Sequence, residues 1–260
     1  MSEAPWVPDG ARVLDLLTAA GCPWPAPSYV DSTGSTNVDA VALASRGAVD
    51  GTCVVAGEQT AGRGRHGRSW ISDPGAGLWS STIIRALENP TRLPLLAALA
   101  VVDVAYDLGG VSWSIKWPND VLDSRGRKVA GILVEGSCGG SDGTAAVVGI
   151  GLNVERPPQE FAQAGSWVDE TGTSPDRSEL LAGLLIALHA RVHQPWDIAL
   201  DDYRVLCRTL GARVHVALPG GEEFEGVGVD VNESGHLVVD TGQTRRMVVA
   251  GDVLHASIAP

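Results

Sequence analysis

The chain has 260 residues, of which 44% are hydrophobic and 19% charged, and its formal net charge is −12 at pH 7. These proportions are typical of a globular protein with one large core, or with one domain and a small satellite. No stretch approaches the roughly 20 consecutive apolar residues of a membrane helix, and so acidic a surface repels nucleic acid and anionic membranes. We therefore expect neither of these as a partner.

The N-terminal sequence, MSEAPWVPDG, lacks the basic segment and apolar run of an export signal, so we expect a cytoplasmic protein. The four cysteines, Cys22, Cys53, Cys138 and Cys207, include no pair at C-x-x-C spacing. Because the cytoplasm is reducing, we expect four free and mostly buried thiols.

The first third of the chain alternates helical and extended patterns. Residues 11–20 have helical spacing, and Gly21 follows as a stop. After a proline-rich connection, the polar turn at 32–37 leads into a short helix that ends near Gly47. The apolar run at 52–58 predicts a buried strand.

A long glycine-rich loop at 59–77 interrupts these elements, and long loops in compact domains usually carry function. A strongly apolar helix at 93–108 follows, and Gly109 and Gly110 end it. Residues 119–127 suggest a tight hairpin between two neighbouring strands. The strands expected in this region are 78–87, 111–117, 128–136 and 144–154.

Two more helices are predicted at 178–193, with Asp176 as the cap, and at 198–210, ended by Gly211. Short strands separated by turn signals follow, which indicates a small closed barrel. We therefore expect an α+β domain over 1–208, with a mixed sheet flanked by helices, and an all-β domain over 209–260.

The sequence GRGRHGR at 62–68 contains the spacing G-x-G-x-x-G, but a dinucleotide-binding fold needs a helix to begin at the third glycine. The following RSWISDPGAG disfavours a helix. Arginine alternating with glycine instead suits a compact anion, because glycine lets backbone N–H groups approach it and arginine supplies a planar charged fork. The alternative is an RNA-binding loop. The acidity of the whole chain and the presence of only one copy of the arginine–glycine pattern disfavour it.

Three further segments carry polar side chains next to apolar strands. Residues 116–120, KWPND, combine a lysine, an amide and a carboxylate, although an ordinary strand end with a turn would look the same. Lys128 enters an apolar strand, where its ammonium either extends to solvent or faces an anion. Gly131 could let a ligand lie against that strand, and Asn153 ends the strand GIGLNV, where an amide can contact an adenine edge.

Taken in order, Ser35-Thr36-Asn37, Gln59 with GRGRHGR, KWPND, RKVAGILVE and GIGLNV resemble the biotin protein ligases over nearly the whole chain from about residue 30. The resemblance implies a class II synthetase-like catalytic domain followed by an SH3-like β domain. It also implies a two-step reaction. Biotin and ATP would give biotinyl-adenylate and pyrophosphate with the help of Mg²⁺, and biotin would then pass to a lysine of a biotin carboxyl carrier domain of an acyl-CoA carboxylase.

The resemblance also implies roles for residues, with Lys128 bridging the biotin carboxylate and the α-phosphate. The residues expected to bind biotin are Ser35, Thr36, Asn37, Gln59, Arg63, Gly64, Arg65, Lys128 and Gly131. Those expected to bind ATP are Arg65, Arg68, Trp70, Asn119, Lys128 and Asn153. Those expected to act in catalysis are Arg65, Lys128, Asp120 and Lys116. The sequence does not name the metal ligands.

Two departures from the family pattern affect these expectations. Only about 30 residues precede the first motif, too few for a DNA-binding domain of roughly 60 residues, so we expect no direct repressor role. His66 stands where another arginine is common in the family. The loop thus has one positive charge fewer, which affects the affinity for ligands and not the type of reaction. The rival hypotheses are a lipoate–protein ligase or acyltransferase and a biotin-binding regulator without catalysis. We expect a monomer or a weak homodimer.

Overall fold

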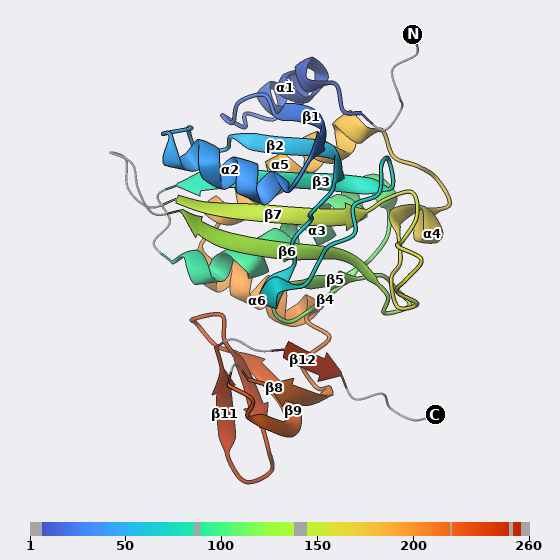
Figure 1. Cartoon of the computed structure of the whole chain (residues 1–260). Coiled ribbons are helices and arrows are strands. Elements are labelled where there is room, and N and C mark those ends of the chain that lie inside the picture. The colour runs from blue at the N-terminus through green and yellow to red at the C-terminus, as the bar shows by residue number, and fades with distance from the viewer. Residues whose placement is uncertain (1–6, 86–88, 138–144, 219, 250–251, 256–260) are drawn as a thin grey trace.

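The computed structural model describes residues 7–85, 89–137, 145–218, 220–249 and 252–255. The larger part is a seven-stranded mixed sheet in the order β1-β2-β3-β7-β6-β5-β4 (Figure 1). β1 and β2 pair in parallel and every other neighbour pair is antiparallel. The strands are β1 Ser28–Thr33, β2 Cys53–Gln59, β3 Gly77–Arg85, β4 Ser114–Lys116, β5 Asp120–Leu122, β6 Lys128–Ser137 and β7 Ala145–Asn153.

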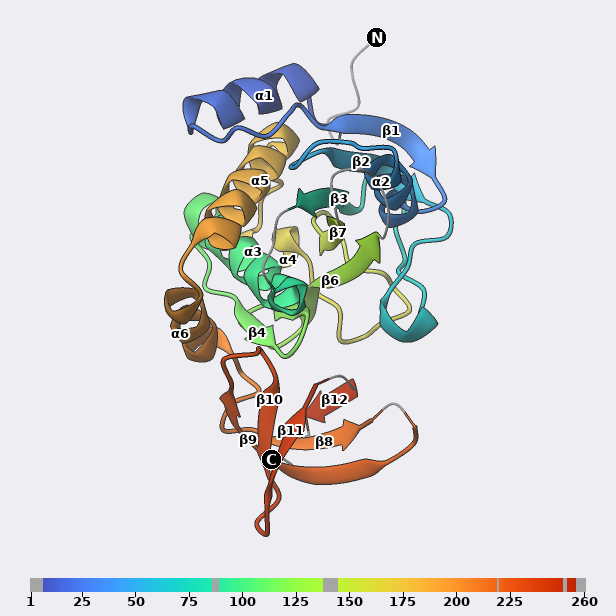
Figure 2. The same cartoon turned by 90° about the vertical axis from the view of Figure 1, so that its left-hand side faces the viewer.

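Helices cover both faces of this sheet, as Figure 2 shows. The helix α3 packs against β6 and β7, α5 packs against α3 and α1, and α2 lies on the opposite face against β2, β3 and β7. The helices are α1 Gly10–Ala19, α2 Thr36–Ser45, α3 Leu93–Gly109, α4 Trp167–Thr171, α5 Arg177–His193 and α6 Trp196–Leu206, with 3-10 turns at Arg65–Gly67 and Pro90–Arg92. None of the described helices is long and apolar enough to span a membrane.

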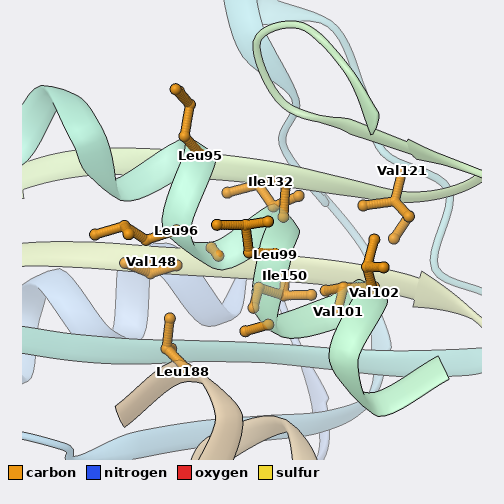
Figure 3. Packing of buried hydrophobic residues seen from close by; sticks show 14 of the residues in the cluster. Leu95, Leu96, Leu99, Val101, Val102, Val121, Ile132, Val148, Ile150 and Leu188 are labelled. Carbon is orange, nitrogen blue, oxygen red and sulfur yellow. The ribbon is translucent and has the colours of Figure 1, made fainter. Parts of the chain in front are cut away.

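The main core lies between α3 and the sheet, because α3 is apolar nearly all round and is therefore buried on most sides. Figure 3 shows Leu96 and Leu99 of α3 next to Ile132 of β6 and Ile150 of β7, with Leu188 of α5 in the same cluster. These two strands form the floor on which the polar cavity described below is built, so the core holds that floor rigid.

A second, smaller sheet follows the α+β region and confirms the expected all-β segment. Its five strands are antiparallel, in the order β11-β10-β9-β8-β12. Both views place it next to β4 and α6 (Figures 1 and 2). The strands are β8 Arg213–Ala217, β9 Glu223–Val231, β10 Leu237–Asp240, β11 Arg245–Val248 and β12 Asp252–His255. Trp117 joins the two sheets, since its Nε1 donates to the Gly235 carbonyl oxygen at 3.0 Å.

The helix boundaries follow from capping. The Asp9 carboxylate accepts from the backbone N–H groups of Ala11 and Arg12, and Asp176, predicted as a cap, accepts from those of Ser178 and Glu179. Gly110 ends α3 in the left-handed conformation at φ 63°, where glycine has no steric penalty.

Two local predictions were wrong, and one helix was not predicted. The segment 119–127 is not one hairpin, because the chain reverses before β5 and again after it, where Asp123 accepts from the backbone N–H of Arg127. The helix predicted over 198–210 ends at Leu206, since Arg208 N–H donates to Ile115 O beside β4. The helix α4 was missed, because five residues are too few for a periodic pattern.

Candidate active site

A cavity of about 700 Å³ opens over β6 and β7. Its walls come from the N-terminus of α2, the loop at 63–71, the turn between β4 and β5, and residues 158–164. All of the predicted site residues line it: Ser35, Thr36, Asn37, Gln59, Arg63, Gly64, Arg65, Arg68, Trp70, Lys116, Asn119, Asp120, Lys128, Gly131 and Asn153. The fold therefore brings together side chains that lie up to about 120 positions apart in the sequence.

One end of the cavity is a network of neutral polar groups at the start of α2. Thr36 donates to the side-chain oxygen Oε1 of Gln59, from its backbone N–H at 2.9 Å and from its hydroxyl at 3.1 Å. Gln59 Nε2 in turn donates to Ser72 Oγ at 2.7 Å. Ser35, only 4% exposed, caps α2 without a side-chain bond to the helix, so its hydroxyl is not used for capping. This end offers uncharged donors and acceptors rather than charge.

Ser81 of β3 links the two residues that follow Ser35. Its hydroxyl lies 2.7 Å from Thr36 Oγ1 and donates to Asn37 Oδ1 at 2.6 Å. Asn37 Nδ2 donates to Glu135 Oε2 at 2.9 Å and to Leu133 O at 3.3 Å, so both donors are used while Oδ1 keeps a second lone pair. A β-carbon on Gly149 would stand 2.1 Å from Asn37 Oδ1, so the missing side chain at Gly149 makes room for this amide.

The predicted loop is an ordered strap, which we define as residues 59–72. Two isolated bridges pair Gln59 with Ser72 and Arg63 with Ser69, and Gly64 N–H donates to Arg68 O at 2.7 Å. His66, at the turn, is the one non-glycine residue with positive φ, 57°, in the described chain. Arg63 pairs with Glu135 of β6 at 3.2 Å, so the strap is anchored to the cavity wall.

The strap also contacts the turn between β4 and β5. Arg65 Nη1 donates to Asn119 Oδ1 at 3.0 Å, and Asn119 Nδ2 donates to Ile132 O at 2.9 Å. Both ends of the Asn119 amide are therefore already bonded within the protein. Asn119 holds Arg65 over the cavity. The predicted contact between Asn119 and adenine would require one of these two hydrogen bonds to break.

Trp70 closes the strap against the sheet floor, where two glycines make room for its indole. A β-carbon on Gly151 would stand 2.5 Å from the Trp70 ring, and one on Gly131 would stand 2.8 Å from it. The Lys128 ammonium lies 5.2 Å from the ring centroid, within the range of a cation–π contact. The glycine spacing in GIGLNV, with Gly149 and Gly151 on one face of β7, was the signal that could have predicted this packing.

The charges gather at the other end of the cavity. Lys128 Nζ lies 2.5 Å from Asp120 Oδ1, and Lys116 is paired in register with Asp120 across β4 and β5. Asp120 is the sole carboxylate among the lining residues that the structure describes. Five cations line the cavity, Arg63, Arg65, Arg68, Lys116 and Lys128, and two of them are paired, Lys128 with Asp120 and Arg63 with Glu135 near the polar end. The excess of cations over carboxylates suits a polyanionic ligand.

Asn153 presents an unpaired acceptor at the end of β7. Its Nδ2 donates to Gly165 O at 3.0 Å, while its buried Oδ1 has no hydrogen-bond partner in the described chain. A buried acceptor without a partner costs free energy unless a ligand or water satisfies it. The residue is 2% exposed and lines the cavity, so a ligand's N–H donor fits here.

Two kinds of residue were not predicted from the sequence: those that hold the polar side chains of the cavity in place, and those of the wall formed by 158–164 and β12. Ser81 and Glu135 position the polar end, and the segment 158–164 and Val253 of β12 line the cavity. The backbone of Lys128 is held between Gln163 O and Gly165 N, at 2.8 and 2.9 Å. Glu135 ends the motif RKVAGILVE but was given no role, and the other residues lie outside the motifs because their partners are distant in sequence.

No cluster of three or more His, Cys, Asp or Glu side chains in the described chain could hold a metal by itself. Mg²⁺ does not need such a cage, because it binds commonly through one or two carboxylates and the phosphates of a nucleotide. Asp120, opposite the cations, supplies one such carboxylate. The donor set therefore fits a magnesium ion that arrives with a nucleotide.

Comparisons with known proteins match most of the chain. A model of the biotin/lipoate A/B protein ligase family matches residues 29–153, and a model of the biotin protein ligase C terminal domain matches residues 209–255. A biotin–[acetyl-CoA-carboxylase] ligase of Mycobacterium tuberculosis is 40% identical over 260 residues, 95% of each chain. A bifunctional ligase/repressor of Bacillus subtilis is 32% identical over 86% of this chain and 72% of its own.

The same similarity appears among solved structures. A biotin protein ligase from Aquifex aeolicus in complex with biotin and ATP superposes with a TM-score of 0.77 at 27% identity, over 88% of this chain and 99% of that one. The fold and the sequence of this chain are thus similar to the same group of proteins.

Proposed function

The chain belongs to the biotin protein ligases of the biotin/lipoate A/B protein ligase family, and from this premise we propose how its own residues carry the reaction. It is an ATP-dependent ligase that adenylates biotin and then transfers biotin to a protein lysine. In the first step a biotin carboxylate oxygen bonds to the α-phosphorus and the bond to pyrophosphate breaks. In the second step the lysine nitrogen bonds to the activated carbonyl carbon and AMP leaves.

The polar end of the cavity supports binding of the neutral biotin ring. Ser35, Thr36 and Asn37 offer hydroxyl and amide groups suited to a ureido group, and Gln59 holds Thr36 through two hydrogen bonds. Because these groups carry no charge, they suit the neutral head of biotin and leave its carboxylate to point toward the cations. The strap residues Arg63 and Gly64 would close over the bound vitamin.

The charged end supports the adenylation step. Two anions, the biotin carboxylate and the α-phosphate, must approach each other, and fixed cations lower the cost of gathering that charge. Lys128 stands between the Trp70 ring and Asp120, a place from which its ammonium can contact both anions. Arg65, Arg68 and Lys116 would neutralise the phosphates, and Trp70 would shield the reactive mixed anhydride from water.

The adenine end and the second step involve other residues. The unpaired Asn153 Oδ1 suits the exocyclic amine of adenine, and Asn119 holds Arg65 in place unless it turns to the nucleotide itself. Asp120 is the carboxylate that would contact Mg²⁺ or the entering lysine ammonium. Magnesium, when bound, would neutralise phosphate charge.

The names of the relatives support a biotin carboxyl carrier domain of an acyl-CoA carboxylase as the acceptor. We also propose a division into a catalytic domain over 1–208 and a β domain over 209–260, which the end of α6 at Leu206 and the start of β8 at Arg213 support. A cytoplasmic location and a monomeric or weakly dimeric state complete the proposal. Sedimentation at several concentrations tests the oligomeric state.

The observation that carries the proposal is one cavity in which a network of uncharged polar groups adjoins a lining rich in cations, with Asp120 paired to Lys128 among them. The test is incubation of the protein with biotin, ATP, Mg²⁺ and a biotin carboxyl carrier domain, followed by mass spectrometry. Biotinylated carrier is expected, with lipoate in place of biotin giving far less product. Failure to form either adenylate or labelled carrier would overturn the proposal.

A further inference from the structure

Two exposed arginines flank the opening of the cavity where the larger sheet meets the small one. Arg125 lies in the turn between β5 and β6, and Arg208 lies between α6 and β8. Gly126, next to Arg125, lines the cavity, and Arg208 Nη1 is 3.3 Å from the position of a β-carbon built on Gly126. Val253 of the small sheet lines the cavity as well. Both arginines therefore lie at its rim.

Within the described residues, no carboxylate neutralises these two guanidinium groups. In the same turn, Arg127 pairs with Asp123 at 2.8 Å and with Asp169 at 2.9 Å, so its charge is compensated. Glu170 is engaged by Trp113 Nε1 and by a backbone N–H of the turn. No ion pair reaches Arg125 or Arg208 from any residue that the structure describes. Two uncompensated cations are thus exposed on a chain whose net charge is −12.

The reaction dictates what must approach this rim. The acceptor lysine has to reach the activated carboxyl inside the cavity, so the surface around that lysine must contact the rim. Near neutral pH the amine arrives as an ammonium, and it is repelled by the excess of cations in the cavity, where five cations stand against the two carboxylates that pair with them, Asp120 and Glu135. A positive rim would attract carboxylates that stand beside the acceptor lysine. This attraction would offset the repulsion of the lysine ammonium.

We propose that Arg125 and Arg208 form a docking surface for an acidic face of the acceptor domain, next to the lysine that receives biotin. The inference rests on the proposed function and adds the chemistry by which the protein substrate is recognised. Because the overall charge of the ligase repels an acidic partner at long range, the attraction must be local to the rim. Rim charges of this kind govern the association rate and its salt dependence.

The test separates the two steps of the reaction. The variant Arg125→Glu/Arg208→Glu is compared with Arg46→Glu/Arg245→Glu, two exposed arginines at the end of α2 and on β11, so that both variants change the net charge equally. Pyrophosphate release without acceptor measures adenylation and also reports correct folding. Transfer from preformed enzyme-bound adenylate to an apo biotin carboxyl carrier domain of an acetyl-CoA carboxylase measures docking.

We expect the rim variant to adenylate biotin at the wild-type rate but to lose about tenfold or more in kcat/KM for the carrier, with the difference shrinking as salt rises. The control variant should stay within about twofold of wild type in both steps. Changing the carboxylates beside the carrier's acceptor lysine to amides should slow the wild type and leave the rim variant nearly unaffected, as coupled residues do in a double-mutant cycle.

Equal transfer by the rim variant and the wild type would overturn the docking surface, as would an equal loss in the control. The docking surface would also be overturned if the rim variant remained equally slower than wild type with the carrier whose carboxylates are changed to amides. A wild-type protein that forms no adenylate would instead contradict the proposed function, so the two failures are distinguishable.

Discussion

The ammonium of Lys128 lies 2.5 Å from the carboxylate of Asp120, at the end of the cavity where the cations gather. β5 and β6 are antiparallel neighbours, with Lys128 opposite Leu122 and Asp120 opposite Gly131, so the two residues are diagonal to each other and the long lysine side chain spans the distance between them. Asp120 thereby keeps the flexible lysine side chain over the sheet floor, beside Trp70.

This placement predicts a large effect of Lys128→Gln on adenylation. The substitution removes the cation from the point where two anions meet, and loss of one such electrostatic contact lowers rates by about 10²- to 10³-fold. Single-turnover pyrophosphate release measures the step. Arg46→Gln, an exposed arginine at the end of α2, is the control and should leave the rate unchanged. A Lys128→Gln protein with half the wild-type rate would remove Lys128 from the mechanism.

Two glycines of β6 provide a matched test of the Trp70 packing. In Gly131→Ala the new methyl group would stand 2.8 Å from the Trp70 ring and 3.2 Å from Lys128 Cε, whereas a β-carbon on Gly136 meets nothing within 4 Å. We expect Gly131→Ala to displace the strap and to lower kcat/KM for ATP by about tenfold or more, since overpacking costs about 1–3 kcal/mol. Gly136→Ala should act like wild type. Equal kinetics for both variants would argue against a fixed place for the indole.

The buried ion pair between Arg177 and Glu155 predicts a contrast in stability. Arg177 is 2% exposed and bonds to Glu155 at 2.9 Å, with Gly75 O as a further acceptor at 3.3 Å. Glu155→Gln leaves the buried guanidinium of Arg177 without its carboxylate and should lower the free energy of unfolding by about 2–4 kcal/mol. Arg177→Met removes the buried charge itself and should lower it by about 1 kcal/mol or less. Urea denaturation measures both. A larger loss in Arg177→Met would reverse this interpretation.

The thiol of Cys53 predicts a pH dependence of stability. Burial raises its pKa from 9.0 to about 11. In the unfolded chain the thiol ionises near its ordinary pKa. The contribution of the buried thiol to the free energy of unfolding is therefore fully present below pH 9. It falls by about 2–3 kcal/mol as the pH rises toward 11. Urea titrations between these pH values measure the loss, and Cys53→Ala should abolish this part of it. An unchanged slope in Cys53→Ala would assign the alkaline loss to other groups.

The same burial predicts that Cys53 does not react with iodoacetamide in the folded protein near pH 8, because only the thiolate is nucleophilic and almost none is present. Mass spectrometry should find Cys53 labelled only after unfolding. Labelling at the rate seen in urea would show that β2 opens readily.

Much of the architecture was accessible from local patterns. Asp176 as a cap, Gly110 as a stop and the apolar run of α3 were all predicted, because capping and periodicity depend on residues within a few positions of each other. The errors arose where distant partners decide. The helix α6 ends at Leu206 because Arg208 bonds to Ile115, about 90 positions earlier, and no local signal contains that bond.

The residue types alone indicate which groups could carry the chemistry, since arginine with glycine, the KWPND motif and Lys128 have side chains whose charge and shape suit phosphate and carboxylate. How these groups are held follows from the folded chain. Ser81 behind Thr36 and Asn37, the glycine floor under Trp70, and Arg208 at the rim beside Gly126 all depend on strand pairing and packing between remote segments. Such contacts are set by the geometry of the folded chain, which local residue types do not encode.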